Sequence, residues 1–318
     1  MLVKLLEPLN VPNEQIAKYG EEIERLGHEF VYYDEKTTDP AELAERSRGA
    51  DVVMIANNPY PTEAIDQNEQ LKLINVAFTG VDHVQIADAK NQDVIISNAA
   101  GYADQAVAEL AIGLVLDLYR GITAGNKDIR QEEPFKPFQG KEIAGKTVGL
   151  VGTGKIGLMT AKLFNAFGAK LIGYDPFENP AAKELGLEYV ELDELMAQAD
   201  IVSLHSPLIP TTKGLISAEK IALMKKDAIL INTARGPIVD NDALAEALNN
   251  DEIAGAGVDV FDMEPPIPSA YKLLHAKNAI LTPHVAFLSD EAMLRRARIA
   301  FDNTIAFLNG EPTNVIKR

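Results

Sequence analysis

The feature that most restricts the fold is a glycine motif between an apolar strand and a helix. Residues Val148–Gly157 read V-G-L-V-G-T-G-K-I-G, and the run Leu158–Phe167 that follows is compatible with a helix. In such a G-x-G-x-x-G motif, the first glycine allows a tight turn, the second lets the backbone approach a pyrophosphate, and the third permits close packing of helix on strand. These roles fall to Gly152, Gly154 and Gly157. The N–H groups and dipole at the helix N-terminus would face the phosphates.

An acidic residue lies where a dinucleotide-binding unit needs one to recognise a ribose. The next predicted strand, Lys170–Tyr174, ends beside Asp175, 18 residues beyond Gly157. A carboxylate at this position accepts hydrogen bonds from the ribose hydroxyls and repels a 2′-phosphate, so it favours NAD over NADP. The alternative is a glycine-rich turn in which Asp175 only caps a helix. The combination of strand, glycines, helix, second strand and acid disfavours that alternative.

Short apolar runs alternate with helical patterns along most of the chain, as is typical of parallel βαβ units. The first hundred residues contain the predicted strands Val3–Leu6, Phe30–Tyr33, Val52–Ala56, Leu73–Ala77 and Val94–Ser97. A second series contains Thr147–Val151, Lys170–Tyr174, Ile201–Leu204, Ala228–Asn232, Gly257–Val260 and Ile280–Thr282. Long helices are expected over Asp104–Lys127, with Gly121 and Gly125 as candidate end points, and over Asp290–Leu308. A chain of 318 residues exceeds what one core usually serves, so the pattern predicts two α/β domains.

The composition excludes several classes of protein. With 47 acidic and 30 basic residues the net charge is −17, which disfavours binding to nucleic acid and to anionic membranes. The absence of cysteine excludes disulfides, thiol nucleophiles and cysteine-ligated metal sites, and no metal site is predicted. No apolar run approaches the length of a membrane span, and the chain start lacks the apolar region of a signal peptide. We therefore expect a cytoplasmic protein.

Three ionisable residues follow later strands of the second series. Arg235 precedes Gly-Pro, Glu264 precedes Pro-Pro, and His284 follows Thr-Pro. The carboxyl ends of strands in an open α/β sheet line the ligand crevice, so these side chains are expected to converge there. Hydride transfer to a keto carbon requires a proton donor, which histidine can supply, and a carboxylate fixes its tautomer. A guanidinium can bind the carboxylate of a 2-keto acid in a bidentate manner.

Each of these residues also has a simpler interpretation. His284 alone fits a loop histidine, Arg235 a structural ion-pair partner, and Glu264 a surface charge. Their joint occurrence downstream of a nucleotide motif favours a catalytic set. His205, at the end of a predicted strand, is a weaker candidate for a cofactor contact.

At these residues the chain resembles a known family, the D-isomer-specific 2-hydroxyacid dehydrogenases. The resemblance covers nearly the whole chain, through motifs at Ala77–His83, Asn98–Glu109, Leu204–Thr212, Asn232–Asp240, Gly255–Pro266 and Thr282–Ala286. It implies a Rossmann-type doubly wound NAD-binding domain at residues 100–288. It also implies a smaller flavodoxin-like α/β substrate domain, made discontinuously of residues 1–99 and 289–318. Relatives are usually homodimers joined through the NAD-binding domain, with the region equivalent to Asp104–Lys127 contributing.

The resemblance also implies roles for individual residues. Arg235 would hold the substrate carboxylate, His284 would act as acid and base, and Glu264 would be its partner. The implied NAD contacts, besides the motif glycines and Asp175, are Lys155, Ile156, Ser206, Thr233, Ala234, Asp259 and His284. The implied substrate contacts are Phe78, Thr79, Gly80, Tyr102 and Arg235, with the backbone N–H groups of Thr79 and Gly80 on the carboxylate.

Some departures from family patterns narrow the substrate. Phosphoglycerate dehydrogenases need basic residues near the substrate phosphate, where this chain has Val76, Ala77 and Phe78. Tyr102 resembles the tyrosine that D-lactate-type relatives place near the substrate, although a buried tyrosine that caps a loop is an equal alternative. Formate dehydrogenases pair their histidine with glutamine, so Glu264 disfavours that activity.

The sequence thus predicts an NAD-dependent enzyme that transfers a hydride between NAD(H) and C2 of a small 2-keto or D-2-hydroxy acid. Two alternatives stay open on the same scaffold: an NAD(H)-sensing binding protein like the transcriptional corepressors of this family, and a phosphite dehydrogenase. A shared fold does not distinguish these three functions.

Overall fold

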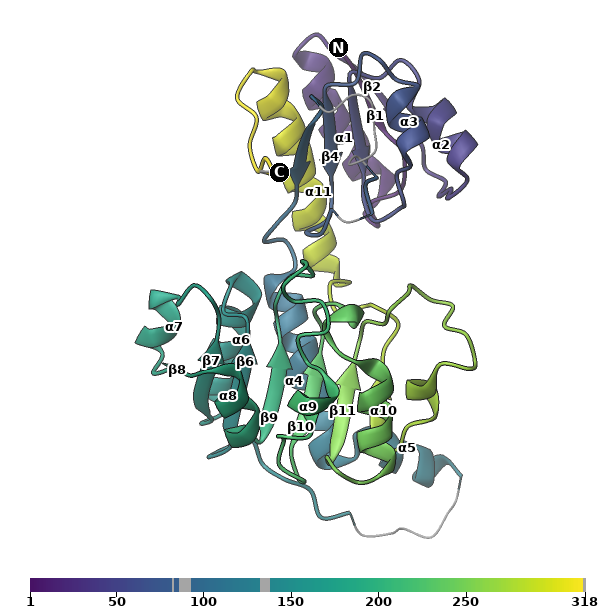
Figure 1. Ribbon diagram of the computed structural model, residues 1–318. Coiled ribbons are helices and arrows are strands. Elements are labelled where there is room, and N and C mark those ends of the chain that lie inside the picture. Colours follow the sequence, from purple (N-terminus) through teal and green to yellow (C-terminus); the bar gives the residue numbers. More distant parts are fainter. Residues whose placement is uncertain (82, 86–92, 132–137, 317–318) are drawn as a thin grey trace. The chain divides into compact units, whose positions relative to one another are not determined.

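The structure of the chain is a computed structural model that describes residues 1–81, 83–85, 93–131 and 138–316 (Figure 1). The chain divides into two compact units. Unit 1 consists of Met1–Ala103 together with Leu288–Arg318, and unit 2 consists of Asp104–Phe287. That unit 1 binds the substrate stays a prediction.

Unit 1 is built on a parallel five-stranded sheet of order β2-β1-β3-β4-β5. Its strands are β1 (Leu2–Leu5), β2 (Glu29–Tyr32), β3 (Val52–Ile55), β4 (Leu73–Val76) and β5 (Ile95–Asn98). Its helices are α1 (Asn13–Arg25), α2 (Pro40–Ser47), α3 (Thr62–Asp66) and α11 (Asp290–Leu308). Ile16 and Ile23 of α1 and Phe301 of α11 are buried together against the strands, so the C-terminal helix completes the core of this unit.

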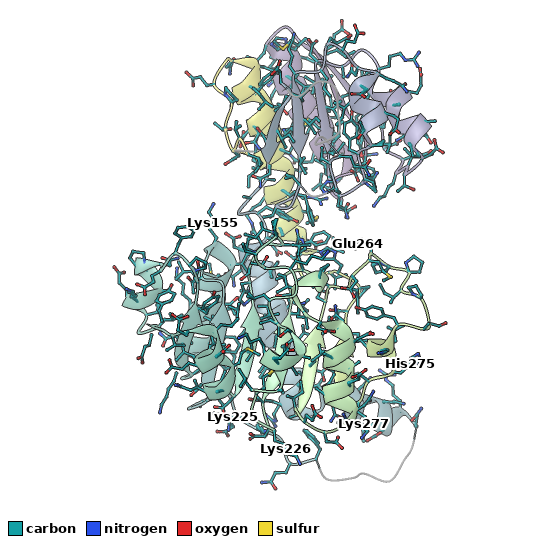
Figure 2. All side chains as sticks on the ribbon, viewed as in Figure 1. Lys155, Lys225, Lys226, Glu264, His275 and Lys277 are labelled. Atoms are coloured by element: carbon teal, nitrogen blue, oxygen red, sulfur yellow. The ribbon has the colours of Figure 1, made fainter. Side chains whose placement is uncertain are left out.

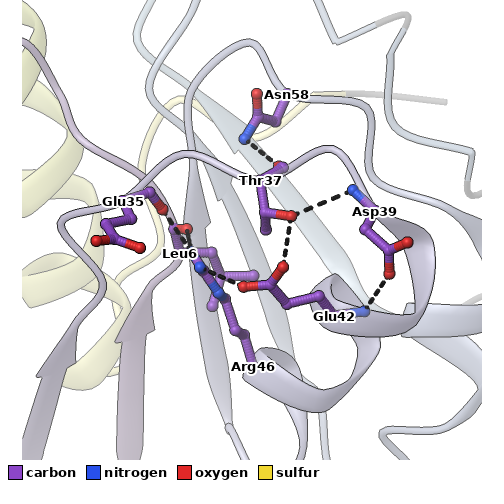
Figure 3. Close-up of polar contacts among 7 residues, drawn as sticks. All are labelled: Leu6, Glu35, Thr37, Asp39, Glu42, Arg46 and Asn58. Carbon is purple, nitrogen blue, oxygen red and sulfur yellow. Dashed lines mark hydrogen bonds and ion pairs between the residues drawn. The ribbon is translucent and has the colours of Figure 1, made fainter.

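Hydrogen bonds hold helix α2 beside the sheet (Figure 3). Asp39 caps the helix, because its Oδ1 accepts a hydrogen bond from Glu42 N at 2.8 Å. The buried Arg46 donates from Nη1 to the carbonyl of Leu6 at 3.1 Å and to that of Glu35 at 2.6 Å. The guanidinium therefore joins the loop after β2 to the end of β1.

Unit 2 is built on a parallel seven-stranded sheet of order β12-β11-β10-β9-β6-β7-β8. Its strands are β6 (Thr147–Val151), β7 (Lys170–Tyr174), β8 (Glu188–Tyr189), β9 (Ile201–Leu204), β10 (Ile229–Asn232), β11 (Gly255–Val258) and β12 (Ala279–Leu281). Its helices are α4 (Asp104–Arg120), α5 (Ile122–Arg130), α6 (Lys155–Ala166), α7 (Pro180–Glu184), α8 (Leu192–Gln198), α9 (Ala218–Ile221) and α10 (Asn241–Asn249).

Helices cover both faces of the unit 2 sheet, and each face has its own core. Leu114 of α4 and Phe164 of α6 are buried in one core, whereas Leu195 of α8 and Leu244 of α10 are buried in the other. The strand order reverses beside β6, as in Rossmann-type doubly wound sheets, and unit 1 has the flavodoxin-like order. The predicted fold class is confirmed.

The structure corrects three details of the predicted elements. The helix expected over Asp104–Lys127 ends beside Gly121, the first of its two candidate end points, whose φ of 61° belongs to the left-handed region, and a second helix then follows. The short strand β8 was not predicted. Strand β11 begins at Gly255, two residues earlier than the predicted Gly257. Within the strand, position 257 requires glycine, because a Cβ there would lie 2.9 Å from Leu114 of α4. None of the helices in the described ranges combines the length and apolar content that a membrane-spanning segment requires.

Candidate active site

The residues predicted to act in unit 2 follow the carboxyl ends of its strands. Figure 2 shows Lys155 and Glu264 at one end of this unit and Lys225, Lys226 and Lys277 at the opposite end. Lys155 comes after β6 and Glu264 after β11, whereas the other three lysines precede strands. The candidate site is therefore at the sheet edge where doubly wound folds bind ligands.

The glycine motif forms the turn between β6 and α6. Gly152 has a φ of 96°, and a Cβ there would lie 2.8 Å from the backbone of His205. A Cβ at Gly157 would lie 2.1 Å from the carbonyl oxygen of Gly152, so a side chain would separate the helix from the turn. At Gly154 a Cβ would meet nothing within 4 Å, and both Gly154 and Lys155 are exposed. The first turn of α6 is thus open to a phosphate.

Asp175 lies at the end of β7 and is held by the neighbouring turn. Its Oδ2 atom accepts a hydrogen bond from Thr153 N at 2.7 Å, and its Oδ1 atom accepts one from Phe177 N at 2.9 Å. The Thr153 hydroxyl lies 2.7 Å from the Tyr189 hydroxyl. These contacts fix the carboxylate beside the glycine motif, where a ribose-binding acid is required.

Other predicted cofactor residues lie at the same edge. Ile156 is in the first turn of α6, Ser206 follows β9, Thr233 and Ala234 follow β10, and Asp259 follows β11. The Thr233 hydroxyl is buried and has no hydrogen-bond partner among the described residues. A buried hydroxyl is costly unless a partner satisfies it, so this atom suits a site that a polar ligand completes. The residues present in unit 2 therefore fit a dinucleotide.

Arg235 lies in the turn after β10, which packs against the loop after β11. The buried Asn232 holds this turn by donating from Nδ2 to the carbonyl of Arg235 at 3.0 Å. A Cβ at Gly236 would lie 2.0 Å from the backbone of Phe261, so the two loops touch at this glycine. Because Glu264 is on the second loop, the packing holds the guanidinium and the carboxylate on neighbouring loops.

His284 and Glu264 are in direct contact. The Nδ1 atom of His284 lies 2.8 Å from Oε1 and 3.0 Å from Oε2 of Glu264. The side chain of His284 is 15% exposed, whereas that of Glu264 is 72% exposed. A carboxylate on Nδ1 orients the ring and fixes its tautomer, so Nε2 is the ring nitrogen that would face a substrate.

A buried carboxylate builds the loop that carries His284. Asp259 accepts hydrogen bonds from Thr282 Oγ1 at 2.6 Å, from Val285 N at 2.9 Å and from Ala286 N at 2.8 Å. Burial raises the pKa of Asp259, and these hydrogen bonds oppose the rise. The backbone of His284 has a φ of 57°, and its N–H donates to the Asp259 carbonyl at 2.8 Å. Asp259 therefore holds a backbone conformation that a histidine rarely adopts.

The predicted substrate residues Phe78, Thr79, Gly80 and Tyr102 lie in unit 1. The first three form the loop after β4, and Tyr102 follows β5. The rings of Phe78 and Tyr102 have centroids 6.1 Å apart. Tyr102 is 1% exposed, and its carbonyl accepts a hydrogen bond from Arg295 Nε at 2.9 Å. Such burial fits a loop-capping tyrosine, so the contact of Tyr102 with substrate stays a prediction.

Several residues that support the site were not predicted from the sequence. Thr153 holds Asp175 and is itself in contact with the Tyr189 hydroxyl. Asn232 holds the Arg235 turn, and Asn98 donates to the Thr79 carbonyl at 2.7 Å. An asparagine at the carboxyl end of a strand, as at positions 98 and 232, is a signal that could have indicated these anchors.

His205, the weaker candidate for a cofactor contact, follows β9 and lies beside the glycine motif. The residue is partly exposed, although its Nδ1 atom is buried, and Nε2 lies 2.9 Å from the Ser203 hydroxyl. Burial lowers the pKa of His205 to about 3, so the ring is neutral near pH 7. A contact of His205 with the cofactor stays a prediction.

Comparisons with known proteins agree with this geometry. A profile of the family described as "D-isomer specific 2-hydroxyacid dehydrogenase, NAD binding domain" matches residues 112–286. The chain is 35% identical over 303 residues to a hydroxypyruvate reductase of Blautia hydrogenotrophica, covering 93% of this chain and 94% of that protein.

Solved structures of similar proteins cover the whole length. An acyclic imino acid reductase in complex with NADPH and D-arginine superposes with a TM-score of 0.88 and 29% identity, covering 100% of both chains. The D-lactate dehydrogenase of Aquifex aeolicus, complexed with NAD and lactic acid, has a TM-score of 0.83 and 28% identity, covering 98% of this chain and 96% of that one. With the profile match and the long sequence similarity, the chain belongs to the D-isomer-specific 2-hydroxyacid dehydrogenase family.

Proposed function

We propose that this protein is an NAD-dependent oxidoreductase that interconverts a small 2-keto acid and the corresponding D-2-hydroxy acid. The observation that carries the proposal is the 2.8 Å contact between His284 Nδ1 and Glu264 Oε1. This pair lies at the sheet edge that also carries the glycine motif and Arg235. Family membership supports the same class of reaction.

The role of each catalytic residue follows from the charge that develops on the substrate. NADH, when bound, supplies a hydride to C2 of the keto acid, which leaves negative charge on the keto oxygen. Protonated His284 donates a proton to that oxygen, and Glu264 stabilises the imidazolium through Nδ1. Arg235 binds the substrate carboxylate and polarises the carbonyl group.

We assign cofactor binding to the edge of unit 2. The exposed first turn of α6 would hold the pyrophosphate through Gly154, Lys155 and Ile156, with Gly152 and Gly157 shaping the turn. Asp175 would bind the ribose hydroxyls and favour NAD over NADP. The remaining contacts are assigned to Ser206, Thr233, Ala234, Asp259 and His284.

We propose that the substrate contacts are made by Phe78, Thr79, Gly80, Tyr102 and Arg235. The backbone N–H groups of Thr79 and Gly80 would bind the carboxylate, and Phe78 and Tyr102 would flank the substrate. The exposure of Thr79 and the partial exposure of Gly80 support this assignment. We expect that the reaction needs no metal ion, because the proton donor His284 and the Arg235 guanidinium would polarise the keto group of the substrate.

The proposal is tested by mixing the purified protein with NADH and a panel of pyruvate, glyoxylate, hydroxypyruvate, 2-ketoisocaproate and oxaloacetate. We expect the NADH absorbance to fall with at least one acid, and the product to be the D-isomer. His284→Ala should lower kcat about 10²- to 10⁴-fold, the range that general acid catalysis contributes. A folded protein that binds NADH but turns over none of the panel contradicts the proposal.

The same experiment separates the alternatives. A corepressor-like NAD(H) sensor would bind NADH without turnover that depends on Arg235 and His284. A phosphite dehydrogenase would reduce NAD⁺ with phosphite, which is added as a separate sample. The relatives named above are reductases and dehydrogenases of organic acids and imino acids, which supports the 2-keto acid reaction.

We also propose that the protein is a cytoplasmic homodimer. Helix α5 has no buried residue, and two of its large apolar side chains are exposed: Ile122 by 57% and Ile129 by 73%. An apolar helix face of this kind is suited to a second copy of the chain. Light scattering should give twice the mass of the chain, and Ile129→Asp should shift the protein toward the monomer. A monomeric wild type at micromolar concentration contradicts this part of the proposal.

A further inference from the structure

The short strand β8 places a tyrosine beside the end of β7. Tyr189 pairs in parallel with Gly173 of β7, and the next residue, Val190, donates from its backbone N to the Gly173 carbonyl at 2.9 Å. Asp175 lies two residues beyond Gly173. The backbone of β8 therefore holds Tyr189 next to the carboxyl end of β7, which carries the acid assigned to the ribose.

The hydroxyl of Tyr189 joins two segments that are distant in the sequence. It accepts a hydrogen bond from Asn179 N at 2.7 Å, and it lies 2.7 Å from the hydroxyl of Thr153. Asn179 is the cap of α7 at the end of the loop after β7, whereas Thr153 lies between the first two glycines of the nucleotide motif. The same two segments are joined a second time, because Asn179 Nδ2 donates to the Thr153 carbonyl at 2.8 Å. The loop after β7 is thus tied to the glycine turn.

The hydrogen bonds of this network run in one direction. Asn179 N can only donate, so the phenol oxygen of Tyr189 accepts and its proton is available to Thr153 Oγ1. The Thr153 hydroxyl in turn donates to Asp175 Oδ2 at 3.2 Å, since a carboxylate only accepts. The chain therefore leads from Asn179 through Tyr189 and Thr153 to the carboxylate, and Tyr189 determines where the Thr153 proton points.

Thr153 depends on these contacts because it is 1% exposed. A residue so deeply buried needs a partner in the protein for each of its polar groups. Its N–H donates to Asp175, its carbonyl accepts from Asn179, and its hydroxyl lies between Tyr189 and Asp175. Removal of the phenol oxygen would leave the Asn179 N–H and the Thr153 hydroxyl each short of one partner, and would loosen the loop that carries Asp175.

We propose that Tyr189 is a positioning residue for the adenosine half of the dinucleotide: its hydroxyl holds the loop after β7 against the glycine turn, so that Asp175 stays directed at the ribose hydroxyls. This inference rests on the cofactor binding proposed above and adds a residue to it. Tyr189 acts through Thr153 and Asn179. Its effect should therefore be limited to ligands that carry the adenosine.

The test compares Tyr189→Phe, which removes only the hydroxyl, with the control Tyr119→Phe. The Tyr119 hydroxyl belongs to the same unit and is buried, but it has no hydrogen-bond partner among the described residues. For each protein we measure the melting temperature and the dissociation constants of three ligands. These are NADH, ADP-ribose, which carries the adenosine half, and reduced nicotinamide mononucleotide, which lacks it. Thr153→Val and the double variant complete a double-mutant cycle.

Loss of one hydrogen bond should raise the dissociation constants of NADH and ADP-ribose about three- to tenfold in Tyr189→Phe. That of reduced nicotinamide mononucleotide should not change, because this ligand has no ribose for Asp175 to bind. Thr153→Val should weaken NADH binding at least as much, and the double variant should lose less than the product of the two separate effects, because both changes break one chain. Tyr119→Phe should keep the wild-type values for all three ligands.

Wild-type affinities in Tyr189→Phe, or equal losses for ADP-ribose and reduced nicotinamide mononucleotide, would overturn the inference, because a merely structural role affects both ligands. A loss in Tyr119→Phe as large as in Tyr189→Phe, or effects that multiply fully in the double variant, would do the same. If Tyr189→Phe does not fold, Thr153→Val breaks the chain at the next link, and the same adenosine-specific loss is expected from it. If the wild type binds NADH but reduces no keto acid, the proposed reaction fails while the ligand comparison still tests Tyr189.

Discussion

The imidazole of His284 meets the carboxylate of Glu264 at 2.8 Å from a backbone that has a φ of 57°. A positive φ is uncommon for a residue of this size, and such a conformation persists only where the surroundings determine it fully. Here the surroundings are the three hydrogen bonds that the Asp259 carboxylate accepts from residues on both sides of His284. The buried Asp259 therefore fixes the backbone that carries the ring, and the exposed Glu264 orients the ring itself.

Replacement of the exposed partner should affect the reaction more than the fold. In Glu264→Gln the protonated imidazole loses a charged partner, so kcat for keto-acid reduction should fall about 10- to 100-fold. Initial rates of NADH oxidation at saturating keto acid measure this effect.

Because the Glu264 side chain is 72% exposed, the melting temperature of Glu264→Gln should stay close to that of the wild type. Glu291→Gln, a change of another acid outside the site, is the matched control and should leave kcat unaltered. A Glu264→Gln protein with the wild-type kcat would remove this residue from the mechanism.

Two glycines of the nucleotide motif should respond differently to the same substitution. Gly157→Ala brings a Cβ within 2.1 Å of the Gly152 carbonyl oxygen, so it should separate α6 from the turn and lower the melting temperature. Gly154→Ala meets nothing within 4 Å in the protein, so the fold should keep its stability. Its methyl group would instead stand where the pyrophosphate approaches, and NADH binding should weaken about tenfold or more.

Thermal unfolding and NADH fluorescence titration distinguish these outcomes. The pair of variants forms its own control, since the substitution is identical and only the surroundings differ. NADH affinity in Gly154→Ala equal to that of the wild type would mean that the pyrophosphate lies elsewhere.

Cofactor preference should depend on Asp175. The carboxylate is fixed by Thr153 N and Phe177 N, so it cannot turn away from a 2′-phosphate. Asp175→Ala should lower kcat/KM with NADH about 10- to 100-fold and reduce it far less, or raise it, with NADPH. Glu178→Ala is the matched control, because this exposed acid pairs with Lys183 rather than with the turn. An unchanged ratio of NADH to NADPH activity in Asp175→Ala would contradict the assignment.

The parts of the fold with strong local signals could be predicted from the sequence. Helix α11 has the predicted bounds Asp290–Leu308, because Ser289 caps it and its apolar residues recur with helical period. Strands β6, β7 and β9 also have the predicted bounds, since each is a short apolar run. The two-residue strand β8 was missed, because two residues give almost no periodic signal. The second helix that begins after Gly121 was also missed, although Gly121 itself was a candidate end of α4.

The residues of the candidate site likewise divide into those that the sequence could predict and those that it could not. Arg235, Glu264 and His284 could be placed at one sheet edge because each follows a strand of the same parallel series. Asp259, Asn98 and Tyr189 support the site through contacts with segments far away in the chain, such as the contact between Asn98 and Asn303. Such roles depend on tertiary packing, which cannot be predicted from the hydrophobic periodicity of a sequence.

The partly buried His205 should make stability depend on pH. Burial lowers its pKa from the ordinary 6.5 to about 3, so the folded protein takes up this proton only below about pH 3. The unfolded chain takes it up near pH 6.5. Between these values the unfolded state binds more protons, so the contribution of His205 to stability is complete above pH 6.5 and is lost as the pH falls toward 3. The slope contributed is at most about 1.4 kcal/mol per pH unit.

In His205→Gln the free energy of unfolding at pH 7.5 should be lower than in the wild type, because the buried ring is lost. Its decline between pH 6.5 and pH 4.5 should nevertheless be shallower, because the residue no longer titrates. Urea unfolding of the apoprotein at several pH values, followed by circular dichroism, measures both. His275→Gln, at an exposed histidine, should keep the wild-type slope. Parallel curves for the wild type and His205→Gln would show that His205 is protonated in the folded protein, contrary to its burial.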